Sequence, residues 1–231
     1  MKEIFQREIK LIGENNYLKL ASSTVAVFGL GGVGSYVVEA LARAGVGKLV
    51  ICDNDVIAPH NINRQLYALH STVGKKKAQV AFERLKDINP NLQVVVKDCF
   101  LDGQTINEFD LSSYSYVADC IDTVTSKILL AKECLSKGVK IISCMGTGNK
   151  LNANFTVKDI KHTKICPLAR VMRRELGKLN LSGLKCVYSE EDPIIFGEDN
   201  EQRRVPSSIS YVPSTAGLLL AGEIIKDIIS G

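Results

Sequence analysis

Short apolar runs alternate along the first two thirds of the chain with longer segments whose apolar positions recur at helical spacing. Runs of this length without polar interruption are typical of strands buried on both faces of a sheet. We predict strands over residues 24–28, 48–52, 92–97, 116–120 and 139–143. We predict helices over residues 3–20, 35–44, 76–88 and 125–137. Strands and helices that alternate in this way indicate right-handed crossovers and a mostly parallel sheet.

The pattern changes after residue 148. Further strands are predicted over residues 153–157, 185–189 and 208–212. One charged helix is expected over 166–179, and the charged, proline-containing segment 190–206 predicts a mobile loop. We expect this half to continue the sheet and to shape a substrate site. The predicted fold class is therefore α/β: a Rossmann-like, mostly parallel sheet with helices on both faces, extended by antiparallel strands in the C-terminal half.

Composition restricts the classes of protein to which the chain can belong. Apolar residues make up 45% and charged residues 23% of the 231 residues, which is ordinary for a soluble globular protein. The apolar segment 216–229 contains Glu223, Lys226 and Asp227, so it predicts an amphipathic helix rather than a membrane span. The seven cysteines include no CxxC pair, which argues against a zinc site and a disulfide framework. Without a signal-peptide pattern, we expect a reduced cytoplasmic location and no membrane partner.

A glycine-rich sequence, GLGGVG at residues 29–34, follows the first predicted strand and precedes a predicted helix. Glycines let the chain turn tightly and let backbone N–H groups approach a phosphate, towards which the helix N-terminus directs roughly half a positive charge. Asp53 closes the next strand, where a carboxylate can hold a ribose hydroxyl. These features predict a nucleotide site, and they leave an NAD-dependent oxidoreductase open as an alternative.

Cationic residues beyond the second strand favour a triphosphate over a dinucleotide. Arg64 lies in the sequence NINRQ, and Lys75, Lys76 and Lys77 follow Gly74. Arginine and lysine near the glycine turn suit the charge that develops during transfer at phosphorus. For Lys75 and Lys76, a solvated start of a helix is an open alternative.

Asp122 follows the strand predicted over 116–120. Open parallel sheets bind ligands beyond the carboxyl ends of their strands, so this carboxylate is expected at the nucleotide site. It is a candidate ligand of Mg²⁺, and the alternative is a cap for the helix that begins near Thr125.

Basic residues are concentrated between residues 161 and 178. Six Lys and Arg stand there against Glu175, a local charge of +5, although the formal net charge of the whole chain is only +4. Three of the arginines are spaced i, i+3, i+4, which places them on one helix face that can follow a phosphate backbone. The alternative is an ordinary exposed helix face. The predicted RNA-binding residues are Lys164, Arg170, Arg173 and Arg174.

The order of five motifs is similar to that of the ubiquitin-activating-enzyme-like superfamily of adenylating enzymes, which includes activators of sulfur-carrier proteins. The motifs are GLGGVGS, DNDVI, NINRQ, VGKKK and ADCIDTV. The resemblance implies catalytic roles for Arg7, Arg64, Lys77 and Asp122, with Mg²⁺ on Asp122. In homodimers of this superfamily an N-terminal arginine reaches the ATP of the other subunit, and Arg7 is its implied counterpart. The implied ATP contacts are Gly29, Gly31, Gly32, Gly34, Ser35, Asp53, Asp55, Asn61, Arg64, Gln65, Lys77 and Asp122.

Segments of the second half resemble the tRNA threonylcarbamoyladenosine dehydratase family. They are MGTGNK, VKDI, PLAR, VYSE and SISYVP. The resemblance runs from about Phe5 to Ile228 and departs from the family at Cys166, where an Asp is more usual. It implies a single domain, residues 1–231, with an ATP-binding half (1–148) and a half for substrate shaping and dimerisation (149–231). The alternative function is activation of the C-terminal glycine of a sulfur-carrier protein. Sulfur-carrier activators usually have two CxxC pairs, and their absence from this chain argues against that alternative.

The implied reaction is the ATP-dependent dehydration of threonylcarbamoyladenosine next to the anticodon of tRNA. ATP activates the threonine carboxylate as an acyl-adenylate or an acyl-phosphate, and an atom of the carbamoyl group closes the ring. Positioning and electrostatics can carry this chemistry, since both reacting groups belong to one substrate. Cys144 and Cys166 are the cysteines to test for a thioester, and a nucleotide-binding module without catalysis is the remaining alternative. The expected partners are tRNA, a second copy of the chain, and a sulfur-transfer or cysteine desulfurase system; a monovalent cation is a further candidate ligand.

Overall fold

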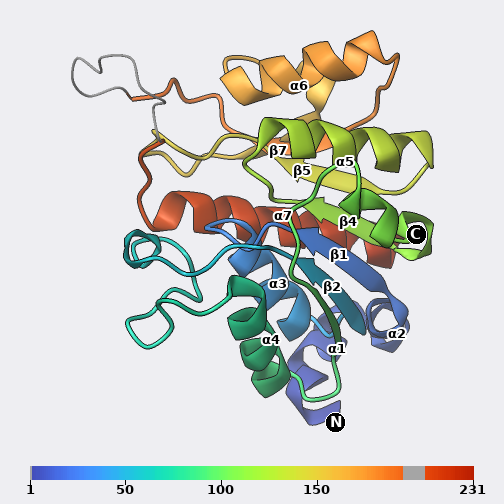
Figure 1. Cartoon of the computed structure of the whole chain (residues 1–231). Helices are drawn as coiled ribbons and strands as arrows, with labels where there is room; N and C mark the ends of the chain where they lie inside the picture. The colour runs from blue at the N-terminus through green and yellow to red at the C-terminus, as the bar shows by residue number, and fades with distance from the viewer. Residues whose placement is uncertain (1, 195–205) are drawn as a thin grey trace.

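A computed structural model describes residues 2–194 and 206–231 of the chain. Within these residues, seven strands form one sheet in the order β3-β2-β1-β4-β5-β7-β6 (Figure 1). Neighbouring strands pair in parallel except β6 and β7, which are antiparallel. The strands are β1 (Thr24–Phe28), β2 (Lys48–Cys52), β3 (Gln93–Lys97), β4 (Tyr116–Asp119), β5 (Ile141–Cys144), β6 (Thr156–Asp159) and β7 (Lys185–Tyr188).

The direction in which strands are added to the sheet reverses between β1 and β4. From β1 the chain adds β2 and then β3 on one side, and it then crosses to add β4 and β5 on the other. Connections on the two sides of such a point leave the sheet in opposite directions, which opens a crevice at the carboxyl ends of the strands. The glycine turn that follows β1 lies at this point.

Helices cover both faces of the sheet. On one face α3 packs on β1 and β2, and α7 packs on α3 and β5, while on the other α5 packs on β4 and β5 and against α6 (Figure 1). The α-helices are α1 (Gln6–Ile12), α2 (Glu14–Ser22), α3 (Gly34–Arg43), α4 (Lys77–Ile88), α5 (Val124–Ser136), α6 (Pro167–Lys178) and α7 (Tyr211–Ser230). Short 3₁₀ helices are η1 (Lys2–Phe5), η2 (Pro59–Asn61), η3 (Thr105–Glu108), η4 (Leu111–Ser113) and η5 (Ile160–His162).

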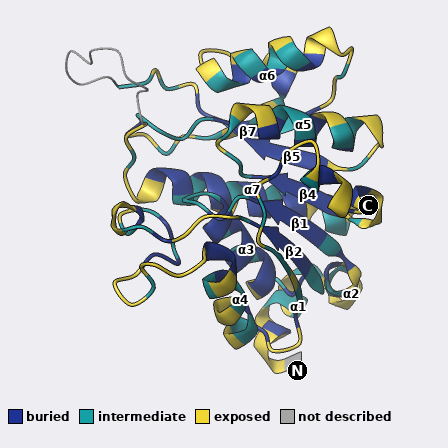
Figure 2. Ribbon diagram, viewed as in Figure 1, coloured by how far each residue is buried: buried dark blue, intermediate teal, exposed yellow. Residues whose placement is uncertain are grey.

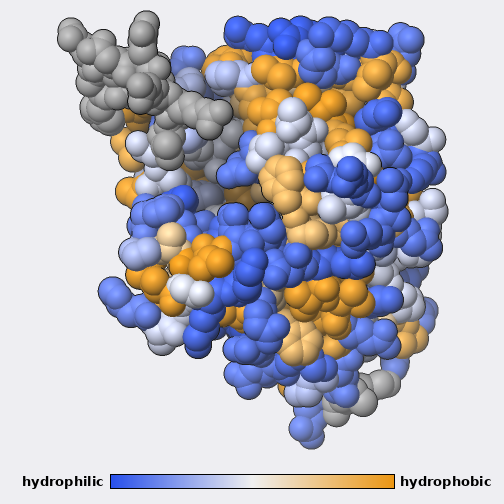
Figure 3. All heavy atoms as spheres, viewed as in Figure 1, coloured by the Kyte–Doolittle hydropathy of each residue, from blue (hydrophilic) through white to orange (hydrophobic). Residues whose placement is uncertain are grey.

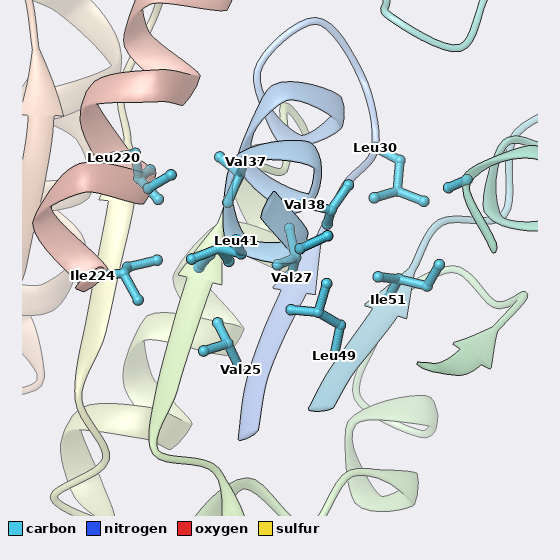
Figure 4. Close-up of a cluster of buried hydrophobic side chains, with 14 of the residues drawn as sticks. Val25, Val27, Leu30, Val37, Val38, Leu41, Leu49, Ile51, Leu220 and Ile224 are labelled. Carbon is cyan, nitrogen blue, oxygen red and sulfur yellow. The ribbon is translucent and has the colours of Figure 1, made fainter. Parts of the chain in front are cut away.

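Alternate residues of the central strands build two separate cores. Val25 and Val27 of β1 face the side of α3 and α7, where Leu41 and Leu220 meet them (Figure 4). Phe28, one residue further along β1, belongs to the core under α5 and α6. Each buried side chain of this size contributes roughly 1.5–3 kcal/mol to folding. The central strands β1, β2, β4 and β5 are therefore buried on both faces, while exposed residues lie on the edge strands and on the outer sides of the helices (Figure 2).

The predicted fold class is confirmed, with β6 as its antiparallel strand. Two element predictions are wrong. The helix predicted over 3–20 is divided at Gly13, whose φ of 84° is unfavourable for other residues. Residues 208–212 are not a strand: α7 begins at Tyr211 and accepts Pro213 in its first turn, where no backbone N–H is needed.

Two further predictions concern the end of the chain and the preceding loop. The C-terminal helix is confirmed and begins earlier than expected, at Tyr211. Residues 195–205 of the predicted mobile loop lie outside the described residues. No helix within the described ranges is long and apolar enough to cross a membrane.

Candidate active site

A cavity of about 680 Å³ lies where the carboxyl ends of β1, β2, β4 and β5 meet. Residues from both halves of the sequence line it, because loops after the strands and the N-terminus of α7 converge there. The cavity brings together nine of the predicted ATP contacts. These are Gly29, Gly31, Gly32, Asp53, Asp55, Arg64, Gln65, Lys77 and Asp122.

The glycine turn is packed so closely that it excludes side chains. Gly29 has a φ of 87°, and a Cβ there would lie 2.7 Å from the carbonyl oxygen of Cys120. A Cβ at Gly34 would lie 1.8 Å from the carbonyl oxygen of Gly29. Gly29, Gly31 and Gly32 line the cavity itself. The glycines therefore both let the backbone turn and let a ligand approach it.

Asp53 is held in one orientation by the backbone. Its Oδ2 accepts a hydrogen bond from the N–H of Leu30 at 2.6 Å, and its Oδ1 accepts one from the N–H of Asp55 at 2.8 Å. Burial raises the pKa of the Asp53 carboxyl above its ordinary value, although Lys77 and the two N–H groups oppose that shift. An acceptor fixed beside the glycine turn suits a ribose hydroxyl.

Lys77 places a buried ammonium at the wall of the cavity. Its side chain is 7% exposed, and its Nζ lies 2.7 Å from Oδ2 of Asp55, whose side chain is 60% exposed. Lys76 is different: it points to solvent and pairs with Asp98 at 3.1 Å. Only Lys77 of the three consecutive lysines therefore lines the cavity.

Arg64 lies against the glycine turn. A Cβ at Gly32 would lie 3.4 Å from Cγ of Arg64. The Arg64 Nη1 donates to the carbonyl oxygen of His60 at 3.0 Å and to Oδ1 of Asn63 at 2.8 Å. These bonds hold a permanent positive charge at the rim, which suits a phosphate.

Three predicted ATP contacts support the wall without lining the cavity. The Ser35 Oγ accepts from the backbone N–H of Leu66, and its carbonyl accepts from the Tyr67 hydroxyl. Asn61 is buried, and its Oδ1 accepts from the N–H of Ala58. Gly34 begins α3 behind the turn. We therefore propose supporting roles for these residues in place of the predicted direct contacts.

Asp122 is exposed to the cavity on the turn between β4 and α5. The N-cap residue of α5 is Thr123, and no side-chain hydrogen bond caps this helix. The alternative role of Asp122 as a helix cap is therefore not seen. No group of three or more His, Cys, Asp or Glu in the described residues could hold a metal ion alone. One carboxylate together with substrate phosphates is, however, a usual environment of Mg²⁺.

Several residues of the cavity wall were not predicted from the sequence. Phe100 and Leu101 follow β3, and Phe100 is 46% exposed, so it offers an apolar surface to a base. Their position after a strand was the available signal, because ligands bind beyond carboxyl ends. The rest of the wall comes from the loop after β5 and from the second half, and it could not be located from one sequence. It comprises Met145, Gly146, Thr147, Gly148, Leu168, Pro206, Ser208 and Pro213.

The predicted RNA-binding residues do not line the cavity but lie on or near α6. Figure 3 shows the hydrophilic outer surface along this helix at the top of the molecule. Lys164 and Arg170 are exposed. Arg174 pairs with Glu175 at 2.8 Å. Arg173 is half-buried, and its Nη1 donates to Oγ1 and the carbonyl oxygen of Thr163 at 2.6 and 2.9 Å, so it braces the segment before α6.

Arg7 and the candidate cysteines lie differently. Arg7 is exposed on α1 and does not line the cavity of its own chain. All seven cysteines are free. Cys144 lines the cavity, and burial raises the pKa of its thiol to about 12. Cys166 is buried behind Gly146. A thiol with this pKa is protonated at neutral pH, which disfavours Cys144 as a nucleophile.

Comparison with known proteins identifies the family to which this chain belongs. Residues 5–231 match the ThiF family. The tRNA threonylcarbamoyladenosine dehydratase of Bacillus subtilis is 39% identical over 97% of this chain and 94% of the relative. The Escherichia coli protein of the same name is 35% identical over 82% of this chain and 74% of its own length.

The fold of this chain also matches a solved structure of the same kind of protein. The crystal structure of the E. coli dehydratase in complex with ATP has a TM-score of 0.91 and 30% identity, and the match covers 99% of this chain and 95% of that one. The resemblance predicted from the sequence is thereby confirmed: the chain belongs to the ThiF family, and within it to the tRNA threonylcarbamoyladenosine dehydratases.

Proposed function

We propose that this chain is an enzyme that uses ATP to dehydrate threonylcarbamoyladenosine beside the anticodon of tRNA, closing a ring. The observation that carries the proposal is the composition of the cavity. The nucleotide-type wall of Gly31, Asp53, Arg64 and Lys77 continues into a second wall from the C-terminal half. ATP and the carboxylate that it activates can therefore meet in the same cavity.

The strand order suggests where each part of the substrates binds. Adenosine is placed between Asp53 and Phe100, beyond β2 and β3, and the phosphates over the glycine turn after β1. The threonylcarbamoyl group is placed against Met145 and Leu168, beyond β5. The carboxylate then approaches the α-phosphorus from the side opposite to the leaving pyrophosphate, and the cavity contributes by holding the two reacting groups in this orientation.

The chemistry follows in two steps. A carboxylate oxygen bonds to the α-phosphorus, and the bond to the bridging oxygen breaks, so that pyrophosphate leaves. An atom of the carbamoyl group then bonds to the activated carbonyl carbon, loses its proton, and AMP leaves. The elements of water are removed overall. Arg64 and Lys77 stabilise the negative charge that increases at phosphorus, and no protein nucleophile is required.

The oxygen donors at this edge of the cavity fit Mg²⁺. Asp122 would hold the ion together with phosphate oxygens, and the exposed carboxylate of Asp55 lines the same cavity. The bound ion would supply charge neutralisation at the phosphates.

Binding of tRNA is assigned to the C-terminal half. Lys164 and Arg170 are exposed on or next to α6, and Leu168 of the same helix lines the cavity. Cations beside the second wall can hold the phosphate backbone while the modified base enters the cavity. This assignment supports the division into an ATP-binding half (1–148) and a substrate half (149–231).

A homodimer completes the proposal. Arg7 lies outside its own cavity, so it acts on ATP only in the cavity of a second copy. The seven free cysteines suit a reduced, cytoplasmic location. A sulfur-transfer or cysteine desulfurase partner and a monovalent cation remain predictions from the resemblance alone.

The decisive experiment is nucleoside mass spectrometry on threonylcarbamoyladenosine-containing tRNA incubated with the protein, ATP and Mg²⁺. We expect a product lighter by one water, which Arg64→Ala does not form. If no such product appears under mild work-up, the substrate assignment is wrong. Pyrophosphate exchange that appears only with a sulfur-carrier protein would support the alternative function instead.

A further inference from the structure

A lysine that the proposed chemistry does not use is completely buried beneath the cavity. Lys127 lies in the first turns of α5, and its side chain and that of Asp119 are both 0% exposed. The Lys127 Nζ donates to Oδ2 of Asp119 at 2.8 Å and to Oγ of Ser143 at 3.1 Å. The Ser143 hydroxyl donates to the same Asp119 oxygen at 2.5 Å. This buried network joins α5, β4 and β5 at their ends nearest the cavity.

Stability alone is a weak reason for such a network. The removal of two charges from water costs several kcal/mol per ion, and apolar pairs of similar volume often replace buried ion pairs without loss. The rest of this core follows that rule, since Leu130, Ala131 and Cys134 of the same helix are buried and apolar. The charged Lys127–Asp119 pair at this position therefore indicates that the orientation of the surrounding backbone matters.

The network fixes both ends of the turn that carries Asp122. On the strand side, Oδ1 of Asp119 accepts from the backbone N–H of Ile121 at 3.2 Å. On the helix side, the backbone N–H of Lys127 donates to the carbonyl oxygen of Thr123 at 3.0 Å. The ion pair links the two ends directly, and Asp122 lies between them with its carboxylate exposed.

The same turn is packed against the glycine turn. The N–H of Cys120 donates to the carbonyl oxygen of Phe28 at 2.8 Å, and Gly29 leaves no space for a Cβ beside the Cys120 carbonyl. Asp122 is therefore fixed relative to the backbone that receives the phosphates, provided that the turn keeps its shape.

We propose that Lys127 is a positioning residue: through Asp119 it sets the distance and direction of the Asp122 carboxylate relative to the glycine turn, and thus the metal affinity of the ATP complex. This inference rests on the proposed binding of ATP and a divalent cation. Ser143 completes the network from β5. None of the three side chains lines the cavity.

The test replaces the buried pair by apolar residues in the double variant Lys127→Met/Asp119→Leu, which leaves no buried charge unpaired. Mn²⁺ binding to the ATP complex is measured by electron paramagnetic resonance, and ATP binding without metal by calorimetry. We expect metal-free ATP affinity to stay near that of the unaltered protein, and Mn²⁺ affinity to fall about 10–100-fold, as is typical for groups that orient a metal ligand. Asp122→Asn provides the reference for complete loss of the ligand.

The matched control is Glu39→Leu/Arg84→Met, which removes an ion pair of 2.7 Å between α3 and α4 that does not line the cavity. It is expected to lower stability and leave Mn²⁺ affinity unchanged. If the double variant in the network keeps full Mn²⁺ affinity, or loses metal-free ATP affinity equally, Lys127 is merely structural. Should that variant not fold, Ser143→Ala decides by the same measurement, with a smaller loss expected.

The readouts separate this inference from the proposed reaction. Metal binding is measured without tRNA, so the absence of a dehydrated product would overturn the proposed function and leave the Mn²⁺ result intact. Lys127→Arg keeps the positive charge, so we expect this variant to retain part of the Mn²⁺ affinity. Full loss in that variant together with full stability would also contradict the proposal.

Discussion

The buried Nζ of Lys77 lies 2.7 Å from the exposed carboxylate of Asp55, at the edge of the cavity. A triphosphate that enters the cavity offers this ammonium a second anion, so Lys77 can contribute without a conformational change. We expect Lys77→Ala to lower kcat/KM for ATP about 10²–10³-fold, since a preorganised charge at the reacting phosphate is lost. Steady-state kinetics at saturating tRNA measures the effect.

The neighbouring lysine supplies the control. Lys76→Ala removes an exposed ion pair with Asp98, which is expected to leave kcat/KM within about twofold because exposed pairs contribute little. Equal losses in both variants would show that general positive charge matters, and not the buried position of Lys77.

Complementation between subunits tests the role of Arg7. Arg7→Ala and Arg64→Ala are each expected to be inactive alone. In an equal mixture of refolded or co-expressed subunits, about one site in four combines an intact Arg64 with an intact Arg7 from the second copy. Recovery of activity to about this level, measured by product mass spectrometry, supports action in trans. Inactive mixtures that sediment as dimers would contradict it.

Cys144 tests whether the reaction passes through a thioester. Burial raises the pKa of this thiol to about 12, so the thiolate nucleophile is scarce at neutral pH. We expect Cys144→Ala to retain kcat within about threefold, because a noncovalent route needs no nucleophile from the protein. Loss of activity in a variant with unchanged ATP affinity would restore the covalent alternative.

The parts of the fold that sequence predicted well are those in which local pattern and tertiary environment agree. The apolar runs around Val25 and Leu49 became central strands because burial on both faces is what such runs satisfy. The strand predicted over residues 208–212 was wrong for the opposite reason. Its β-branched and aromatic residues favour a strand locally, while packing of α7 on α3 and β5 makes it the start of a helix.

The residues of the candidate site also divide into those that the sequence predicted and those that only the structure shows. Asp53 and Asp122 were predicted because each follows a strand at the ligand-binding edge, and Lys77 was predicted because the VGKKK motif resembles that of a known superfamily. Phe100 was missed although it follows β3, since its place after a strand does not by itself show that an aromatic side chain faces the cavity. Helical spacing placed Arg173 with its neighbours, but only the folded structure shows that its guanidinium turns inward to Thr163.

Acid lability provides a further prediction, at Asp227. Burial alone would raise the pKa of this carboxyl, but hydrogen bonds from Lys185 and Tyr116 hold it below the ordinary value of 3.8. A depressed pKa adds stability that is fully present above the ordinary value and is lost as pH falls through the lower, folded-state value. Asp227→Asn should therefore reduce the urea-unfolding free energy at neutral pH, and the difference should shrink in strong acid. A difference that does not change with pH would exclude this linkage.

Arg170 and Arg173 separate tRNA binding from folding on one helix. Arg170 is exposed, so Arg170→Ala should raise KM for tRNA, leave KM for ATP unchanged, and reduce the slope of log affinity against log salt concentration by about 1. Arg173 is bonded to Thr163, so Arg173→Ala should lower the melting temperature and leave the salt slope unchanged at temperatures where the protein is folded. Salt-dependent filter binding and thermal unfolding measure both effects. If Arg173→Ala alone changes the salt slope, the phosphate contact belongs to Arg173, and its bonds to Thr163 must open when tRNA binds.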